Sequence, residues 1–293
     1  MLAIVRGAGD LATGVIYRLY KCGFKMLVLE IDQPSSIRRT VSFSECIYNS
    51  NGEQIVEGVK SRKVETLEEI KKCWLNREIP IVIDPWGKWI KELKPNIVVD
   101  AIIAKKNLGT TITMAPITVG LGPGFIAGKD VGTVIETMRG HNLGRVIKVG
   151  EAEKNTGNPG DIAGVTVERV IYAKISGKFK SFKKIGDFVK KDEPIGSIDS
   201  ELVRATIDGL LRGIIRDNYD VKKGLKIADI DPRLNQYNNC FTISDKARAL
   251  GGSVLEAIFS EIVEKGEKDG FKYFGENFWN CKIRKKGSSS NNN

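Results

Sequence analysis

The sequence has few of the side chains that commonly carry metal or imidazole chemistry. Its 293 residues include one histidine, His141, so any general acid or base that works through imidazole must be this residue. The five cysteines are widely scattered and contain no Cys-x-x-Cys pair: Cys22, Cys46, Cys73, Cys240 and Cys281. Their spacing argues against a zinc or iron–sulfur site and against a disulfide framework. We therefore expect no metal site.

Long apolar runs are also missing. No stretch approaches the ~20 apolar residues that a membrane helix needs. Met1 is followed at once by an apolar run typical of a strand, which leaves no room for a signal peptide. These two absences predict a cytoplasmic protein without a membrane partner.

Several catalytic motifs are absent. The chain has no Ser-His-Asp order, no His-Glu-x-x-His and no Gly-x-x-x-x-Gly-Lys-Ser/Thr. The glycines between Gly122 and Gly128, followed by Lys129, lack both the spacing and the hydroxyl residue of a P-loop. The patterns therefore indicate neither a triad hydrolase, nor a zinc protease of this type, nor a P-loop enzyme.

Basic motifs with interleaved aromatic residues are missing too, although the formal net charge is +10. The basic residues are spread along the chain. The densest cluster, between Lys174 and Lys191, has seven lysines against one acid, Asp187, in a segment that alternates like a strand. Lysines at an exposed sheet edge commonly prevent edge pairing. We expect no nucleic acid partner, and an anionic small ligand explains the charge equally well.

The most informative segment that is present lies at the N-terminus. An apolar run at 2–5 leads into Arg-Gly-Ala-Gly-Asp-Leu-Ala-Thr-Gly at 6–14. A helical pattern then continues to about Cys22, and a second apolar run at 26–29 ends in Glu30. This order of strand, glycine turn, helix, strand and acid is the layout of a dinucleotide-binding βαβ unit.

Each part of this layout has a chemical reason. Gly7 allows the tight turn, and Gly9 has no Cβ to block a pyrophosphate. The helix N-terminus offers free N–H groups to phosphates, and an acid at the end of the second strand can bind ribose hydroxyls. The alternative is a glycine turn that only lets the helix pack, with a solvated acid. The predicted cofactor-binding residues of this unit are Gly7, Gly9, Asp10, Leu11, Ala12 and Glu30.

The pattern continues as α/β. Apolar runs at 79–84 and 97–103 predict buried strands, and helical spacing predicts helices at 61–75 and 86–93. Such runs, separated by helices, favour parallel strands covered on both faces. We predict a Rossmann-like parallel sheet domain over residues 1–165, with glycine-rich loops at 105–160.

An internal repeat marks a second region. Residues 175–199 align without a gap to residues 207–231, with eight of 25 positions identical. Two such units can close a small sandwich, and we predict an internally repeated all-β module at 166–235. The repeat resembles the biotinyl/lipoyl-type barrel-sandwich fold, which carries its cofactor on a lysine between the halves. The link at 200–206 has no lysine, so this module is not expected to carry a cofactor. It is expected instead to support or cover another part of the protein, or to serve as a docking surface.

The C-terminal part contains one amphipathic helix. Ser244 and Asp245 cap a pattern that runs to about Lys265, and its apolar stripe is Ala247, Leu250, Val254, Ile258 and Ile262. Gly251 and Gly252 permit either close packing or a break. We assign 236–280 to a helical segment and 281–293 to a disordered tail.

Polar residues suited to catalysis or ligand binding gather at 105–160, after the strand that ends at Ile103. Ligands of open α/β sheets bind beyond the carboxyl ends of the strands, and long glycine-rich loops commonly line sites. Arg139 can clamp a phosphate or carboxylate, and Asp100 needs a partner, such as Lys105 or a loop N–H. The predicted catalytic residues are His141, Arg139 and Lys105, and Lys106 and Asn107 complete the cofactor-binding set. The alternatives are a surface histidine and a solvated lysine pair.

Taken together, these strings resemble the accessory proteins of selenium-dependent molybdenum hydroxylase systems in anaerobic bacteria. The resemblance spans about residues 1–265 and is carried by the segments 6–14, 100–107, 114–116, 120–125, 136–141, 155–157, 229–233 and 251–257. It implies a maturation role for such a hydroxylase, with the hydroxylase or its cofactor-loading machinery as partner. A similarity confined to the βαβ start links the chain to xanthine dehydrogenase accessory factors, and by analogy the glycine turn holds a molybdopterin dinucleotide rather than NAD(P).

The sequence leaves three alternative functions open. The first is an accessory protein that binds a nucleotide-containing cofactor, either molybdopterin cytosine dinucleotide or NAD(P), with Lys105, Lys106 and Arg139 on its phosphates. The second is an NAD(P)-dependent oxidoreductase that acts on a small anionic substrate with His141 as proton donor. The third is a non-catalytic docking protein. Without paired cysteines, a sulfur or selenium relay by this chain would depend on one of five isolated thiols.

Overall fold

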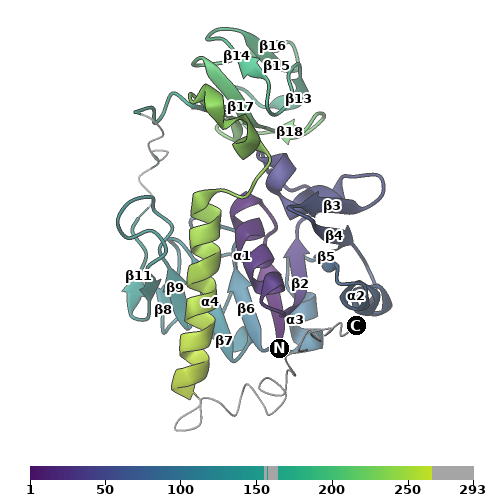
Figure 1. Cartoon of the computed structure of the whole chain (residues 1–293), viewed down its shortest axis with the longest axis vertical. Helices are drawn as coiled ribbons and strands as arrows, with labels where there is room; N and C mark the ends of the chain where they lie inside the picture. The colour runs from purple at the N-terminus through teal and green to yellow at the C-terminus, as the bar shows by residue number, and fades with distance from the viewer. Residues whose placement is uncertain (155–156, 158–163, 266–293) are drawn as a thin grey trace, which may run out of the picture.

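A computed structural model describes residues 1–154, 157 and 164–265. The disordered tail predicted at 281–293, Cys281 and most of the string at 155–157 lie outside the described residues. The described chain forms a mixed α/β unit with a large sheet, above which stands a smaller β module (Figure 1).

The large sheet is mainly parallel. Within the described residues it has nine strands in the order β10-β9-β7-β6-β1-β2-β5-β4-β3, and only the outer strands β10 and β3 run antiparallel to their neighbours. The bounds are β1 (Leu2–Arg6), β2 (Lys25–Glu30), β3 (Glu53–Val56), β4 (Val59–Lys63), β5 (Ile79–Ile83), β6 (Ile97–Asp100), β7 (Ile117–Leu121), β9 (Thr133–Ile135) and β10 (Val146–Ile147). The chain crosses from β5 to the opposite side of β1, so the strand order reverses between β1 and β6.

The central strands are buried because helices cover both faces. Along β1, Ala3 and Val5 belong to one apolar cluster, whereas Ile4 belongs to another on the opposite face. The first cluster includes side chains of α1 (Asp10–Lys21) and α4 (Asp245–Lys265), and the second includes side chains of α2 (Leu67–Leu75) and α3 (Lys88–Leu93). Near-continuous apolar strands are the expected sequence of such a two-sided core.

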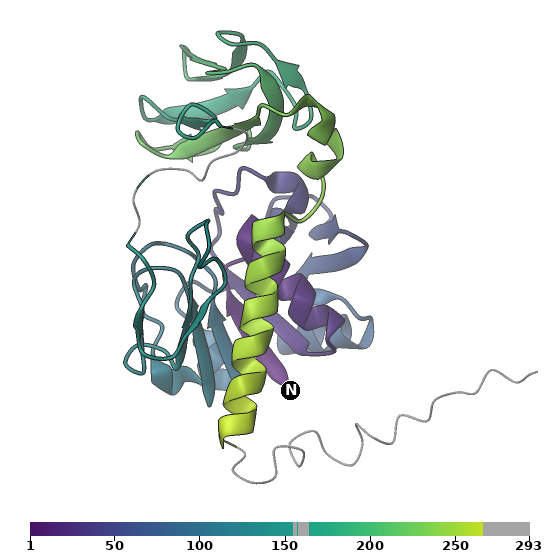
Figure 2. The ribbon, with the colours of Figure 1, turned by 60° about the vertical axis from the view of Figure 1, so that its left-hand side comes forward.

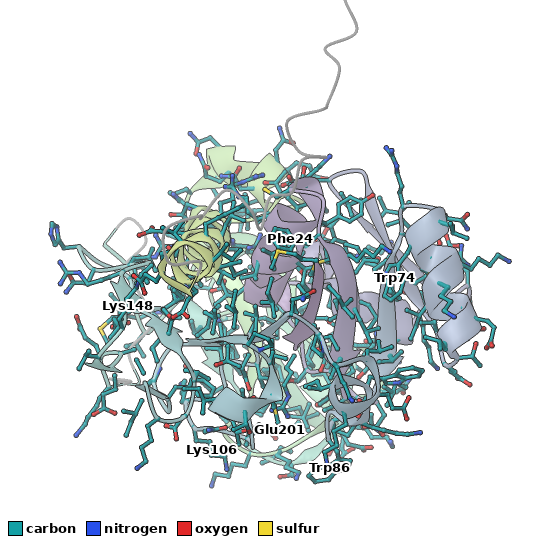
Figure 3. All side chains as sticks on the ribbon, turned by 90° about the horizontal axis from the view of Figure 1, so that it is seen from below. Phe24, Trp74, Trp86, Lys106, Lys148 and Glu201 are labelled. Atoms are coloured by element: carbon teal, nitrogen blue, oxygen red, sulfur yellow. The ribbon has the colours of Figure 1, made fainter. Side chains whose placement is uncertain are left out.

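Helices α1 and α4 pack unusually closely. A Cβ at Gly14 of α1 would lie 2.3 Å from the carbonyl oxygen of Ala247, and a Cβ at Gly251 would lie 2.5 Å from the carbonyl oxygen of Gly14. The close-packing alternative predicted for the Gly251 region is therefore confirmed. The two helices run side by side in Figures 1 and 2. Figure 3 shows α4 nearly end-on between Lys148 and Phe24. The ring of Phe24 packs edge-to-face on the ring of Phe259 in α4, with 6.5 Å between the ring centroids.

Two predictions about local structure were wrong. The helix predicted at 61–75 begins only at Leu67, because residues 59–63 pair as β4 in a hairpin with β3 and then with β5. The segment 105–160 is not a set of loops alone, since β7 and β9 extend the parallel sheet there, and β8 (Ile126–Ala127) pairs with β11 (Gly150–Glu151). Short 3-10 turns occur at η1 (Arg39–Val41), η2 (Phe43–Ile47), η3 (Ile112–Met114) and η4 (Leu234–Cys240).

The β module reproduces the sequence repeat in space. Its two antiparallel sheets have the orders β12-β19-β17-β14 and β16-β15-β13-β18 over the described residues. The strands are β12 (Val170–Tyr172), β13 (Gly177–Ser181), β14 (Phe188–Val189), β15 (Pro194–Ile198), β16 (Glu201–Arg204), β17 (Gly209–Ile214), β18 (Asp220–Val221) and β19 (Lys226–Asp231). The second strand of each repeat pairs with the first strand of the other, as β14 with β17 and β18 with β13. The halves thus share one apolar core, which includes Phe179 and Ile195.

The module faces the carboxyl ends of the central strands (Figure 1). The segment that follows β2 connects the two parts, since the Ile214 amide donates to the Ile37 carbonyl at 2.9 Å and Arg39 Nε donates to the Ile214 carbonyl at 2.9 Å. Over the described part of the chain, no helix is long and apolar enough to cross a membrane. The same residues contain no group of three or more His, Cys, Asp or Glu side chains placed to hold a metal ion.

Candidate functional site

The glycine turn after β1 adopts the geometry that its sequence requires. Gly7 has a φ of +95°, and a Cβ there would lie 3.1 Å from backbone atoms of Ala101 and Ile102. Only glycine fits this left-handed position and close approach. Gly9 is the N-cap of α1, and a Cβ there would contact only Ser36 Oγ at 3.4 Å. Gly7 therefore shapes the turn, whereas Gly9 leaves open space in front of the helix.

The first turn of α1 presents unused backbone donors. The Thr13 amide donates to the Gly9 carbonyl at 2.8 Å, but the amides of Asp10, Leu11 and Ala12 have no acceptor among the described residues. Free N–H groups at a helix N-terminus, together with the positive end of the helix dipole, attract anions. The structure thus places free amide donors at the helix end where the sequence predicts phosphate binding.

Glu30 lies at the end of β2, beside the turn. Its carboxylate accepts hydrogen bonds from the amides of Ala8 and Ile31, both at 2.8 Å. Burial raises the pKa of this carboxyl, and the two amide donors act against that rise. Each carboxylate oxygen has a second lone pair, so Glu30 can still accept from ligand hydroxyls.

A crevice of about 230 Å³ lies in front of the turn, and we call it the glycine-turn crevice. Its lining residues come from the segments that follow β1, β2 and β6, from the last residue of β2 and from the first turn of α1, and they are Gly7, Gly9, Asp10, Leu11, Ala12, Glu30, Ile31, Pro34, Ser35, Ser36, Ala101, Ile102 and Ile103. It lies where the strand order reverses, which is the usual ligand position in open α/β sheets.

The loop after β6 is held by a buried polar cluster. Asp100 accepts from the Thr110 hydroxyl at 2.6 Å and from the Ile102 amide at 3.1 Å, and it lies 3.6 Å from the Arg6 guanidinium. Burial raises the pKa of Asp100, while Thr110 and Arg6 lower it. The predicted need for a partner is met by a loop N–H and by Arg6, whereas Lys105 forms no ion pair with Asp100.

A second cavity, which we call the basic pocket, lies between the sheet unit and the β module, with a volume of about 610 Å³. It shares residues such as Asp10, Leu11 and Ser36 with the glycine-turn crevice. Its described lining includes three acids, Asp10, Glu153 and Asp229, and seven basic side chains: Arg38, Lys105, Arg139, Arg169, Arg212, Lys226 and Lys246. The two cavities therefore form a continuous wall in which positive charge dominates.

The structure brings most of the predicted residues together. All six residues predicted in the βαβ unit line the crevice, and Lys105 and Arg139 line the basic pocket. Arg139 also forms a bidentate ion pair with Asp245, at 2.7 and 3.0 Å.

Three other predicted residues lie outside both linings. His141 is an exposed side chain in the turn after β9, where the structure gives it no position for acid or base work on a ligand in either cavity. Lys106 is exposed as well. Asn107 stabilises its own turn, because its side chain bonds the backbone of Gly109 and Thr110.

The predicted site residues do not include Arg38, Arg212 or Lys246, which line the basic pocket. Arg38 is 5% exposed, donates to the carbonyls of Asn239 and Thr242, and lies 3.8 Å from Asp10. These cations come from three distant segments. No local motif could have connected them, and the excess positive charge was the only signal in the sequence.

The described thiols differ sharply in exposure. Cys46, Cys73 and Cys240 are buried, and Cys22 is exposed. Burial raises the pKa of Cys46 to about 12 and that of Cys73 to about 11, and it also raises the pKa of Cys240. Because the thiolate is the reactive form, these three thiols are poorly suited to a sulfur or selenium relay.

The chain is similar in sequence to a longer protein without an assigned function. An uncharacterized protein, YqeB, from Escherichia coli K12 is 48% identical over 267 residues, which cover 91% of this chain and 49% of that protein. The chain thus spans about half the length of this relative. No protein-family model matches the chain.

Solved structures show only a distant likeness. A succinylglutamate desuccinylase from a Silicibacter strain is 12% identical, with a TM-score of 0.24, over 78% of this chain and 84% of that one. The product-bound ectoine utilization protein EutE from Ruegeria pomeroyi has the same identity, TM-score and coverage. At this TM-score neither likeness carries an argument about fold or function.

Proposed function

We propose that the chain binds a nucleotide-containing anionic cofactor at the glycine turn of a Rossmann-like domain. The observation that carries the proposal is the set of three unsatisfied amides at the start of α1, which lie at the lining of the crevice where the strand order reverses. Phosphate oxygens would accept from these amides, and Glu30 would accept from ribose hydroxyls.

The shape of the site suits a ligand with a nucleotide at one end and further anionic groups beyond it. Ile31 and Ile102 give the crevice apolar walls for a base, and the basic pocket continues from the crevice past Asp10. Molybdopterin cytosine dinucleotide and NAD(P) both have this build. The resemblance of the sequence to accessory proteins of selenium-dependent molybdenum hydroxylases favours the pterin dinucleotide, and with it a role in maturation of such a hydroxylase.

Calorimetry with NAD, NADP, CTP and molybdopterin cytosine dinucleotide tests this proposal. We expect one dinucleotide to bind selectively, and we expect Gly9→Asp to weaken it by about 100-fold, because a carboxylate would stand before the helix N-terminus. Gly9→Ala should have a smaller effect, since its Cβ would make an ordinary 3.4 Å contact. Gly252→Asp adds the same charge on α4, where a Cβ meets nothing within 4 Å, and serves as the matched control. If no nucleotide bound at all, the turn would serve only to pack the helix.

The cellular role needs a separate test. If the chain acts as a maturation factor, Gly9→Asp should abolish maturation of the hydroxylase while leaving the abundance of the chain unchanged. A docking protein would instead support maturation with this substitution in place. An oxidoreductase that uses His141 gains no support from the geometry, because this side chain is exposed and absent from both cavity linings.

A further inference from the structure

The cations of the basic pocket are not balanced by the acids around them. Asp229 pairs with Arg169 at 2.5 Å and lies 3.9 Å from Arg212, and Asp10 pairs with Arg38. Arg139 is engaged by Asp245. The ammonium groups of Lys105, Lys226 and Lys246 then have no ion-pair partner among the described residues, and Glu153 also pairs with no cation there.

Lys246 shows the cost of this imbalance most clearly. It lies in the first turn of α4, where the helix dipole disfavours a cation. Burial lowers the pKa of its ammonium group, and the nearby charges of Arg139 and Lys226 lower it further, while those of Asp10 and Glu136 act against this fall. An anion bound beside this ammonium group would offset the repulsion from Arg139 and Lys226.

Two guanidinium groups of the basic pocket also have unused hydrogen-bond donors. Arg38 and Arg212 each have an Nε donor without an acceptor among the described residues. Burial lowers the pKa of Arg38, and the charge of Arg212 lowers it further. One buried and one half-buried guanidinium group, each with an unused Nε donor, favour the approach of an anion with several oxygens.

From this arrangement we infer that the basic pocket binds a diphosphate group, which bridges the sheet unit and the β module. Arg38 and Lys246 come from the sheet unit, and Arg212 and Lys226 come from β17 and β19 of the module. The N-termini of α1 and α4 also reach the lining, through Asp10 and Ser244. A dianionic or trianionic group would compensate charges from both parts at once, and so fix the module over the crevice. The inference depends on the proposed function only for the source of the diphosphate, either the cofactor or a free anion.

The test uses sodium pyrophosphate as the probe, with calorimetry and thermal unfolding of the full chain. Lys246→Gln and Arg212→Met should each weaken pyrophosphate binding at least 10-fold. Lys246→Gln should unfold at the same or a higher temperature than the wild type, because it removes a crowded cation, so lost binding cannot be ascribed to misfolding. Lys71→Gln, an exposed lysine on α2, makes the same charge change away from the pocket and should leave the affinity unchanged.

Competition separates the two sources of the diphosphate. If pyrophosphate displaces the dinucleotide, the pocket holds the diphosphate of the cofactor, and if the two bind together, it holds a free anion. Absence of pyrophosphate binding at millimolar concentration would overturn the inference, as would equal weakening by Lys71→Gln. Dinucleotide binding that is lost in Gly9→Asp, combined with no pyrophosphate binding by the wild type, would leave the proposed function standing and remove this inference alone.

Discussion

The glycine-turn crevice and the basic pocket share a wall but are built in different ways. The crevice takes most of its lining from one βαβ unit, and it offers backbone amides and one acid, Glu30. The basic pocket collects side chains from residue 10 to residue 246, and it offers charged groups. Under the two proposals, one anion site is encoded locally in backbone geometry and the other is assembled from distant cations. Substitutions should affect the two sites separately.

The largest expected effects come from the buried ion pairs, of which each region has one. Asp100 faces Arg6 below the crevice, and Asp229 faces Arg169 in the basic pocket. Asp100→Asn and Asp229→Asn should each destabilise the fold by about 3–5 kcal/mol, because each removes a carboxylate charge that faces a buried guanidinium. Chemical denaturation measures this loss.

Pyrophosphate distinguishes these two variants. It should stabilise Asp229→Asn more than the wild type, because the anion replaces the lost charge and bound ligand adds stability by mass action. It should raise the melting temperature of Asp100→Asn only as much as that of the wild type. Equal ligand-induced shifts in both variants would contradict the assignment of diphosphate to the basic pocket.

Two adjacent glycines of α4 should give effects of opposite sign. Gly251→Val should cost about 2–3 kcal/mol, because its Cβ would lie 2.5 Å from the Gly14 carbonyl oxygen and the helices would have to separate. At Gly252 an added Cβ would meet no atom within 4 Å, so Gly252→Ala should stabilise the helix by about 0.5–1 kcal/mol. Lys246 of α4 lines the basic pocket, whereas no residue of α4 lines the crevice. Gly251→Val should therefore weaken pyrophosphate binding more than dinucleotide binding, and melting curves with calorimetry check both points.

The same contrast explains what the sequence could predict. The segment 6–30 contains its strand, turn, helix and acid in one continuous pattern, so its structure and the six crevice residues follow from local rules. The close approach of Gly251 to α1 was also open to prediction, because adjacent glycines in an apolar stripe have few structural explanations.

The remainder required tertiary structure. Residues 61–63 have apolar neighbours compatible with a helix, and pairing with β5 makes them a strand. His141 drew attention as the single histidine, but the turn after β9 leaves it exposed. Lys246 and Arg212 look like ordinary surface cations in the sequence, and only the position of the β module over the sheet brings them to one pocket.

A smaller effect should follow from Glu30→Gln. A glutamine has one carbonyl oxygen where the carboxylate has two acceptors, so it can serve only one of the Ala8 and Ile31 amides with a full acceptor. We expect about 10-fold weaker dinucleotide binding, in line with the loss of about one charged hydrogen bond. Pyrophosphate binding should be unchanged or slightly tighter. The same loss with both ligands in calorimetry would indicate that the two cavities act as one site.

The smallest effect concerns the ion pair between Asp245 and Arg139 at the edge of the basic pocket. Arg139 holds the pKa of Asp245 well below its usual range, so this pair adds stability above about pH 4 and loses it as the pH falls. Because Asp245 is largely exposed, Asp245→Asn should cost only about 0.5 kcal/mol at pH 7. The difference from the wild type should narrow below pH 4 in urea denaturation, and a gap that widened on acidification would contradict this assignment. The substitution also frees Arg139 for the pocket, so pyrophosphate should bind about twofold more tightly, and dinucleotide contacts at Glu30 should not change.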